Sequence, residues 1–159
     1  MFAKFDSRKT YFDGLGEIIT NANSSEQAIK LAKLDYEVVK QPLFVQSPLR
    51  KVANQFATVR TDTKDILGVV GKNYNILQNK EAFDFLDGLV EGGATIETGG
   101  TYRGSSASFI TASTEPMNIL GDEFKPYLLI MNSFDGSGSV RVMFTPVRVF
   151  CSNCLALAI

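Results

Sequence analysis

The feature that most constrains this fold is a pair of apolar runs near the C-terminal end, separated by a short glycine- and serine-rich turn. Residues 127–134 and 140–150 are rich in Leu, Ile, Val, Phe and Met, and the sequence DGSG lies between them. Asp, Gly and Ser favour chain reversal, so the pattern predicts an antiparallel β-hairpin. Pairing Leu129 with Phe144 and Asn132 with Arg141 makes both faces largely apolar. We therefore expect both strands at the centre of a sheet, with Leu129 and Phe144 buried.

The bulk composition is that of an ordinary globular protein. A chain of 159 residues with 45% hydrophobic and 21% charged residues can form one domain around one core. The formal charge of -1 excludes the broad positive field of a strongly basic nucleic-acid binder, although a local basic patch is compatible with it. No apolar run is long enough to span a bilayer, and the N-terminus has no hydrophobic signal core. We expect a cytoplasmic protein that does not associate with membranes.

Two helices are predicted from capping residues and apolar spacing. Ser24 and Gln27 form a capping box, and apolar residues then recur at helical spacing to about residue 35. Asn79 is a suitable N-cap for a second helix over residues 80–90, which Gly92 would end.

Strands are predicted between and after these helices. The expected segments are 36–46, 56–61, 66–71, 95–97 and 107–113, in addition to the hairpin described above. Pro42 cannot donate a ladder hydrogen bond and therefore places the first segment at a sheet edge. Residues 98–106, TGGTYRGSS, predict a hairpin turn with Tyr102 and Arg103 exposed at its tip.

These elements define the expected architecture. Two helices packed on a mostly antiparallel sheet of about six strands, built from hairpins, make an α+β fold. We expect residues 1–23 to form an N-terminal arm and residues 24–159 to form a single domain. The final residues CLALAI resemble a helical turn without a stop signal, so we expect the chain to end within a helix of a longer protein.

From Leu34 onward the motifs carry a resemblance. LDYEVVKQPLF, LGVVGKNYNILQNKEAFDFLD, the TGG turn and PVRVFCSN occur in this order, and the chain resembles the phage/plasmid-like protein family, domain of unknown function 932. The resemblance implies an origin in mobile elements and an N-terminal portion of a longer protein, but no chemistry. Relatives often carry His where this chain has Asp13 and Phe134, and the chain contains no His. Histidine-based catalysis or zinc binding is therefore not expected here.

Three other groups of residues have features of a functional site. Cys151 and Cys154 have the spacing of half a zinc site, but the chain offers no further Cys and no His, so we expect a structural or incidental role and no metal or cofactor; a disulfide or an intermolecular metal is the alternative. The glycine-rich turns lack the frame of a phosphate-binding loop. The nearby carboxylates are expected to be solvated, in a turn (Asp62 and Asp65) and on the second helix (Glu81, Asp84 and Asp87).

Cations and aromatic residues on or beside the predicted strands form the candidate site. Single-strand-binding sheets combine such residues, because cations contact phosphates and aromatic rings stack on bases. The candidates are Arg60, Lys72, Tyr74, Tyr102, Arg103, Arg141 and Arg148. Arg141 and Arg148 lie in apolar runs and could instead form structural ion pairs.

Two classes of function follow. The first is a non-enzymatic accessory protein of a phage or plasmid that binds DNA, with single-stranded DNA as partner, in replication, recombination or host takeover. The alternative is a protein-interaction module, an inhibitor or adaptor of a host or phage factor. An enzyme is disfavoured because the chain has no His, no nucleophile motif and no cluster of metal ligands.

Overall fold

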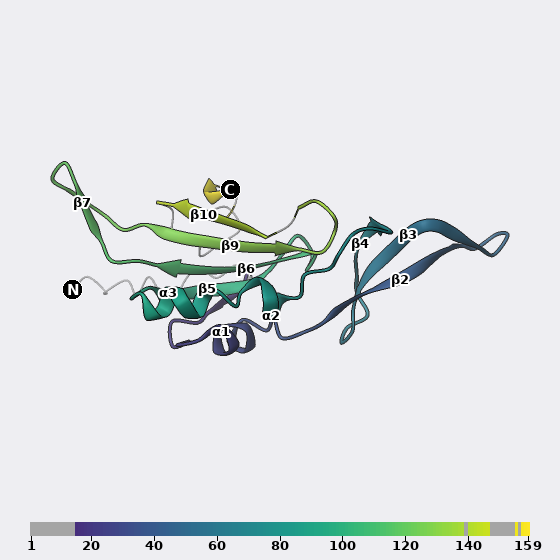
Figure 1. Cartoon of the computed structure of the whole chain (residues 1–159), viewed down its shortest axis with the longest axis horizontal. Coiled ribbons are helices and arrows are strands. Elements are labelled where there is room, and N and C mark those ends of the chain that lie inside the picture. The colour runs from purple at the N-terminus through teal and green to yellow at the C-terminus, as the bar shows by residue number, and fades with distance from the viewer. Residues whose placement is uncertain (1–14, 139, 147–154, 156) are drawn as a thin grey trace, which may run out of the picture.

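The computed structural model describes residues 15–138, 140–146, 155 and 157–159 (Figure 1). The described part has ten strands in three antiparallel sheets together with α-helices, which confirms the α+β class but not the expected number of strands. The largest sheet has the order β1-β5-β6-β9-β10. Its strands are β1 (Glu17–Ile18), β5 (Thr95–Tyr102), β6 (Ala107–Ser113), β9 (Tyr127–Ser133) and β10 (Arg141–Thr145).

The predicted C-terminal hairpin exists, but only one of its strands is central. β9 lies between β6 and β10, whereas β10 is an edge strand. Leu129 is fully buried as expected, but Phe144 is 76% exposed. The register also differs by one residue, because the connection runs from Ser133 to Arg141 and is longer than the DGSG turn; Leu129 pairs with Met143. The shift places Phe144 opposite Leu128, on the face of the main core, but β10 is the edge strand and Phe144 stays exposed, so the predicted burial of Phe144 is wrong.

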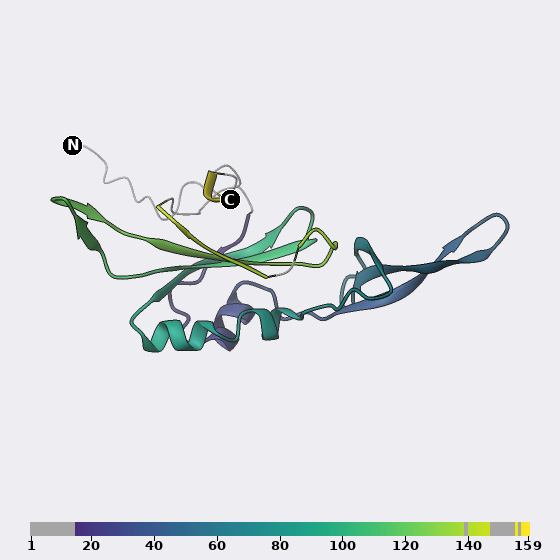
Figure 2. The ribbon, with the colours of Figure 1, turned by 45° about the horizontal axis from the view of Figure 1, so that its top comes forward.

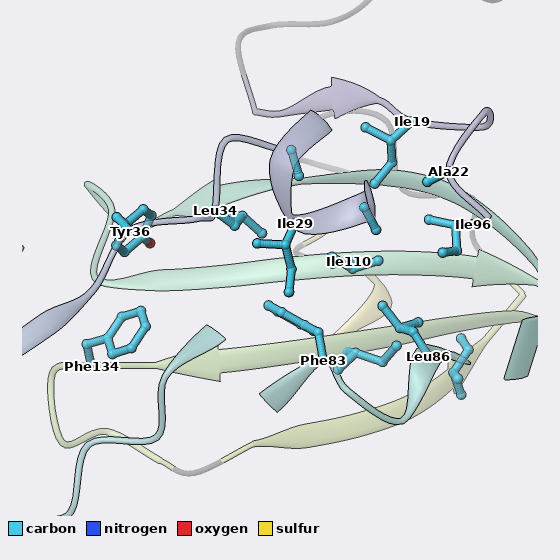
Figure 3. Packing of buried hydrophobic residues seen from close by; sticks show 14 of the residues in the cluster. Ile19, Ala22, Ile29, Leu34, Tyr36, Phe83, Leu86, Ile96, Ile110 and Phe134 are labelled. Carbon is cyan, nitrogen blue, oxygen red and sulfur yellow. The ribbon is translucent and has the colours of Figure 1, made fainter. Parts of the chain in front are cut away.

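Short helices cover one face of the large sheet (Figure 2). These are α1 (Ser25–Leu31), α2 (Asn79–Ala82) and α3 (Leu86–Glu91). The main core lies between them and the sheet (Figure 3), and its fully buried side chains include Phe83, Leu86, Ile96, Ile110 and Ile130. α1 begins as predicted, since the Gln27 amide donates to Ser24 Oγ over 3.2 Å. The helix predicted over residues 80–90 is instead divided between α2 and α3.

Asn79 is a buried core residue and not the N-cap, so that prediction is wrong. The extended N-cap residue of α2 is Gln78. The Asn79 side chain is 1% exposed, and its Nδ2 donates to Leu34 O over 3.0 Å. Its Oδ1 accepts from Ser108 Oγ at 2.5 Å and from Asn132 Nδ2 at 3.2 Å. Asn79 thus ties α2 to the sheet, because a buried amide must find partners and the sheet supplies them.

The opposite face of the large sheet carries a second, smaller core cluster. It is formed by Leu15, Phe109, Leu129 and Leu155. β9 is therefore covered on both faces, as predicted. Residues 15–23 of the expected arm contribute β1 and the buried side chains Ile19 and Ala22, while residues 1–14 lie outside the described residues.

A three-stranded sheet projects beyond the end of the large sheet, and we call it the wing (Figures 1 and 2). It consists of β2 (Val38–Val45), β3 (Arg50–Arg60) and β4 (Ile66–Gly71), with β3 in the centre. The edge position of β2 and the hairpin around residues 61–65 are confirmed. A further small hairpin of β7 (Met117–Ile119) and β8 (Asp122–Phe124) was not predicted.

The wing is attached to the body at its base. Thr58 Oγ1 donates to Phe134 O over 2.7 Å, and the Gln78 side chain pairs with both backbone groups of Val38. Gly68 lies so close to the β9–β10 turn that a Cβ there would be 2.5 Å from Asp135 Cα. The base of one wing face is therefore closed against the body, while the rest of the sheet extends outward.

Candidate nucleic-acid interface

Charge is unevenly divided between the wing and the rest of the chain. The wing together with Lys72, which follows it (residues 38–72), contains six cations and two carboxylates, a formal charge of +4, which leaves -5 for the remainder. The cations are Lys40, Arg50, Lys51, Arg60, Lys64 and Lys72. No carboxylate occurs in the 24 residues from 38 to 61. A positive sheet that projects from a negative body favours contact with polyanions at the wing.

One face of the wing interleaves cations with aromatic rings. Strand alternation places Lys40 and Phe44 on the same face of β2. Register places Lys51 opposite Phe44 and Phe56 opposite Pro42, again on this face. Lys40 Nζ lies 5.3 Å from the centroid of the Phe56 ring, and Phe44 is 56% exposed. We call Lys40, Phe44, Lys51 and Phe56 the basic face; it has the residue types that bind phosphates and stack on bases.

Lys72 and Tyr74 lie beside the basic face, in the segment that follows β4. Lys40 Nζ donates to Lys72 O over 3.0 Å and to Tyr74 O over 2.8 Å, while the Lys72 residue itself is exposed. Tyr74 Oη donates to Ser133 O over 2.9 Å. Burial, and secondarily the carboxylate of Asp135, raise the pKa of Tyr74. Lys72 is thus available for a phosphate, whereas the Tyr74 hydroxyl links the wing to the large sheet.

Arg60 is placed at the base of the wing and is engaged in structural contacts. Its Cζ lies 3.7 Å from the centroid of the Tyr36 ring, and its guanidinium donates to both carboxylate oxygens of Asp62 at 3.0 and 2.7 Å. The hydrogen bond from Arg60 lowers the pKa of Asp62 to about 2. Only 12% of the Arg60 side chain is exposed. These contacts fit a residue that fixes the wing base better than one that binds a phosphate.

Tyr102 differs from the expected exposed hairpin tip. β5 continues through the TGGTY sequence, so Tyr102 ends a strand and packs partly against the second core cluster. The glycines make this extension feasible, since a Cβ on Gly100 would lie 2.5 Å from Gly16 Cα of the neighbouring segment. Arg103 begins the turn with φ 54° and is exposed, with its Cζ 5.4 Å from the Tyr102 ring centroid. The predicted exposure of Tyr102 at a hairpin tip is therefore wrong, because its side chain is half-buried.

The structure brings several predicted residues to one end of the large sheet, beside the wing (Figure 1). Phe134 N donates to Ser106 O, and Ser106 N donates to Arg103 O, so the β5–β6 and β9–β10 turns are adjacent. Arg141 begins β10, is exposed, and lies with Nη2 3.5 Å from Ser137 O. Arg148 falls outside the described residues, as do Cys151 and Cys154.

Sequence reasoning missed most of the basic face. Phe44, Lys51 and Phe56 were not among the candidates, nor were Lys40 and Arg50. The available signal was the long stretch without a carboxylate, which contains four of the wing's cations. Which of them share a face depends on the pairing of β2 with β3.

The helix side of the body is acidic. A groove of about 580 Å³ runs along α1 and the start of α2, and its carboxylates are Glu26, Asp35, Glu37, Glu81, Asp84 and Asp87. Asp87 is not merely solvated, because it accepts hydrogen bonds from Ser25 N at 2.6 Å and Ser25 Oγ at 2.9 Å. Among the described residues, no three His, Cys, Asp or Glu side chains are arranged to hold a metal ion. The groove's charge disfavours a polyanion on this side.

Comparison with known proteins identifies the family. The model described as Domain of unknown function (DUF932) matches residues 66–159, more than half of the chain, so the protein belongs to this family. The match begins at β4, and β2 and β3 precede it. No curated protein and no solved structure matches the chain. Within the described residues, no helix combines the length and apolarity needed to cross a membrane.

Proposed function

We propose that this member of the DUF932 family is a non-enzymatic accessory protein that binds single-stranded DNA along the basic face of the wing. The observation that supports the proposal most directly is the cross-strand arrangement of Phe44 with Lys51 and of Phe56 beside Lys40. An exposed ring can stack on a base while the adjacent ammonium contacts the phosphate. A duplex would bury its bases and leave the rings without a stacking partner.

The proposed setting is the cytoplasm of a cell that carries a phage or plasmid. Replication and recombination of such elements expose single strands, and host takeover is a third setting in which a DNA-binding accessory protein would act. The charge division supports an orientation in which the wing meets the strand and the acidic helix side faces away.

Substitution of Phe44 tests the stacking contact. Phe44→Ala should weaken binding to a fluorescein-labelled oligo(dT) by about 5- to 150-fold, the loss of one stacked base. Folding stability should change little, because the ring is largely exposed in the free protein. Phe144→Ala is the matched control, since Phe144 is an exposed phenylalanine on β10 of the large sheet, whereas the basic face belongs to the wing. Fluorescence anisotropy measures both affinities.

Salt dependence tests the phosphate contact. Lys51→Ala should reduce the slope of log K against log salt by about 0.7, the value for one phosphate of a single strand. Lys30→Ala, in the acidic groove, should leave the slope unchanged. The proposal is rejected if the parent protein binds no oligonucleotide at low salt, or if Phe44→Ala and Lys51→Ala bind as the parent does.

The alternative is a protein-interaction module, and one observation favours it. The wing also exposes large apolar side chains on the side opposite the basic face, among them Ile66 and Val69. A parent protein that binds no oligonucleotide but captures a defined protein through the wing would support an adaptor or inhibitor.

A further inference from the structure

The wing has a second face that the basic face leaves unexplained. Register places Val39, Val59 and Ile66 in one cross-strand row and Ala57 beside Val69 in another, all on the side away from Lys40. The side chains of the two edge strands are exposed, Ile66 at 69%, Val69 at 53% and Val39 at 38%, whereas Val59 and Ala57 of the central strand are already buried between them, at 5% and 4%. We call these five residues the apolar face. An open sheet face of this kind is a common site of association between proteins.

The charges of the apolar face are confined to its two ends. Glu37 directly precedes β2 and also borders the acidic groove; alternation from Val39 places it on this side, at the base of the wing. Arg50 pairs with Val45 at the tip of the same side. Between these ends the strand positions of this side carry Gln, Gly or apolar residues and no ionisable side chain. The face therefore has a neutral middle, a negative base and a positive tip.

We propose that the apolar face is the interface with a second copy of this chain, the two wings packing antiparallel across a twofold axis. That arrangement sets the tip of each wing against the base of the other, so Arg50 of each copy meets Glu37 of its mate in two equivalent pairs. The neutral middle brings no like charges together. A polyanion fits this face poorly, because Arg50 is the only cation on it and lies at one end.

The small area of the face predicts a weak association. Eight residues of β2 span roughly 26 Å and three strands roughly 14 Å across, which is on the order of 350 to 400 Å² in projection. Specific interfaces usually bury about 800 Å² on each partner, so the expected dimer is weak, with a Kd in the micromolar range. Both basic faces point outward in this dimer and stay accessible.

Sedimentation velocity over protein concentrations from about 1 to about 300 µM tests the proposal in the range where such interfaces dissociate. The parent protein should shift from monomer to dimer. Val69→Asp should remain monomeric at every concentration, because a dimer would bury the new charge in the neutral middle of the interface. Its circular dichroism spectrum should be unchanged. Phe144→Asp is the matched control, an exposed apolar residue on β10 of the large sheet, and should dimerise as the parent does.

Charge reversal tests the antiparallel arrangement. Arg50→Glu and Glu37→Arg should each weaken the dimer by about tenfold, and the double variant should restore it, because the two pairs reform with opposite sense. A parent that stays monomeric throughout, a Val69→Asp variant that still dimerises, or a double variant no better than the singles would each overturn the proposal. None of these measurements depends on DNA binding, so the two proposals can fail separately.

Discussion

Replacement of Asn79 by Ala offers the sharpest test of how the helices are held to the sheet. The side chain is buried and makes three hydrogen bonds, to Leu34 O, Ser108 Oγ and Asn132 Nδ2. Ser108 and Asn132 each keep another acceptor, Asn132 O at 3.5 Å and Leu77 O at 2.9 Å. Asn79→Ala should therefore remove three hydrogen bonds and leave chiefly the Leu34 carbonyl without the amide.

The expected cost follows from these contacts. Three hydrogen bonds at about 1 kcal/mol each, with a further penalty for one desolvated carbonyl, amount to a loss of about 3 to 5 kcal/mol. A helix N-cap would contribute only about 0.5 to 2 kcal/mol. Urea denaturation followed by circular dichroism separates the two values, because the shift in midpoint multiplied by the m-value gives the change in unfolding free energy.

The control for Asn79→Ala is a substitution of an exposed asparagine whose side chain accepts one hydrogen bond. Asn118 Oδ1 accepts from Gly121 N over 2.9 Å in the β7–β8 turn, and Asn118→Ala should cost less than about 1 kcal/mol. If Asn79→Ala is no more destabilising than Asn118→Ala, the buried network does not hold α2 to the sheet and the reasoning is wrong.

Two further predictions concern glycines and acid. Gly88→Ala should stabilise the protein by about 0.5 to 1 kcal/mol, since Gly88 lies within α3 with open space at its Cβ position. Gly68→Ala should destabilise the protein by about 1 to 3 kcal/mol, because its Cβ would clash with Asp135. Urea midpoints equal to that of the parent protein would contradict both predictions. The folded pKa of Asp62 lies at about 2, below its ordinary value of 3.8, so its ion pair with Arg60 contributes stability above pH 4 that is lost as the pH falls towards 2. Asp62→Asn should remove that part of the acid dependence. The effect should be less than about 1 kcal/mol, because about half of the Asp62 side chain is exposed. If the unfolding free energies at pH 5 and pH 2 differ by as much in the variant as in the parent, the prediction is refuted.

Local signals in the sequence predicted much of the secondary structure. The N-cap role of Ser24, the turn at residues 61–65 and the edge position of the strand with Pro42 are confirmed, whereas the Gln27 side chain accepts from Asn23 N and so does not complete the predicted capping box. The edge position of β10 and the exposure of Phe144 could not be predicted, since they depend on which strands pair in the folded sheet. Asn79 shows the same limit. Its residue type suits an N-cap, but in the fold it is a core residue, because it hydrogen-bonds to Ser108 and Asn132 of the large sheet.

The candidate site was only partly predictable for a related reason. Sequence shows that Arg60 and Tyr74 accompany strands, but the contacts that occupy them come from distant segments, Tyr36 for the former and Ser133 for the latter. The basic face depends on the pairing between β2 and β3, including a shift in register between Pro42 and Phe44. Such a bulge cannot be located from composition, and it decides which side chains face one another.

The division of the wing into two unlike faces explains why both proposals can hold in one small sheet. The wing is closed against the body only at its base, so both of its faces can contact other molecules. A charged face and an apolar face require different partners. Placing all of Lys40, Phe44, Lys51 and Phe56 on one side leaves the other side free of the repulsion that would oppose self-association. Conversely, covering the apolar side with a second copy would stiffen the sheet that presents the basic side. A single strand of DNA that binds the wing would then contact a preorganised surface, which lowers the entropy cost of binding.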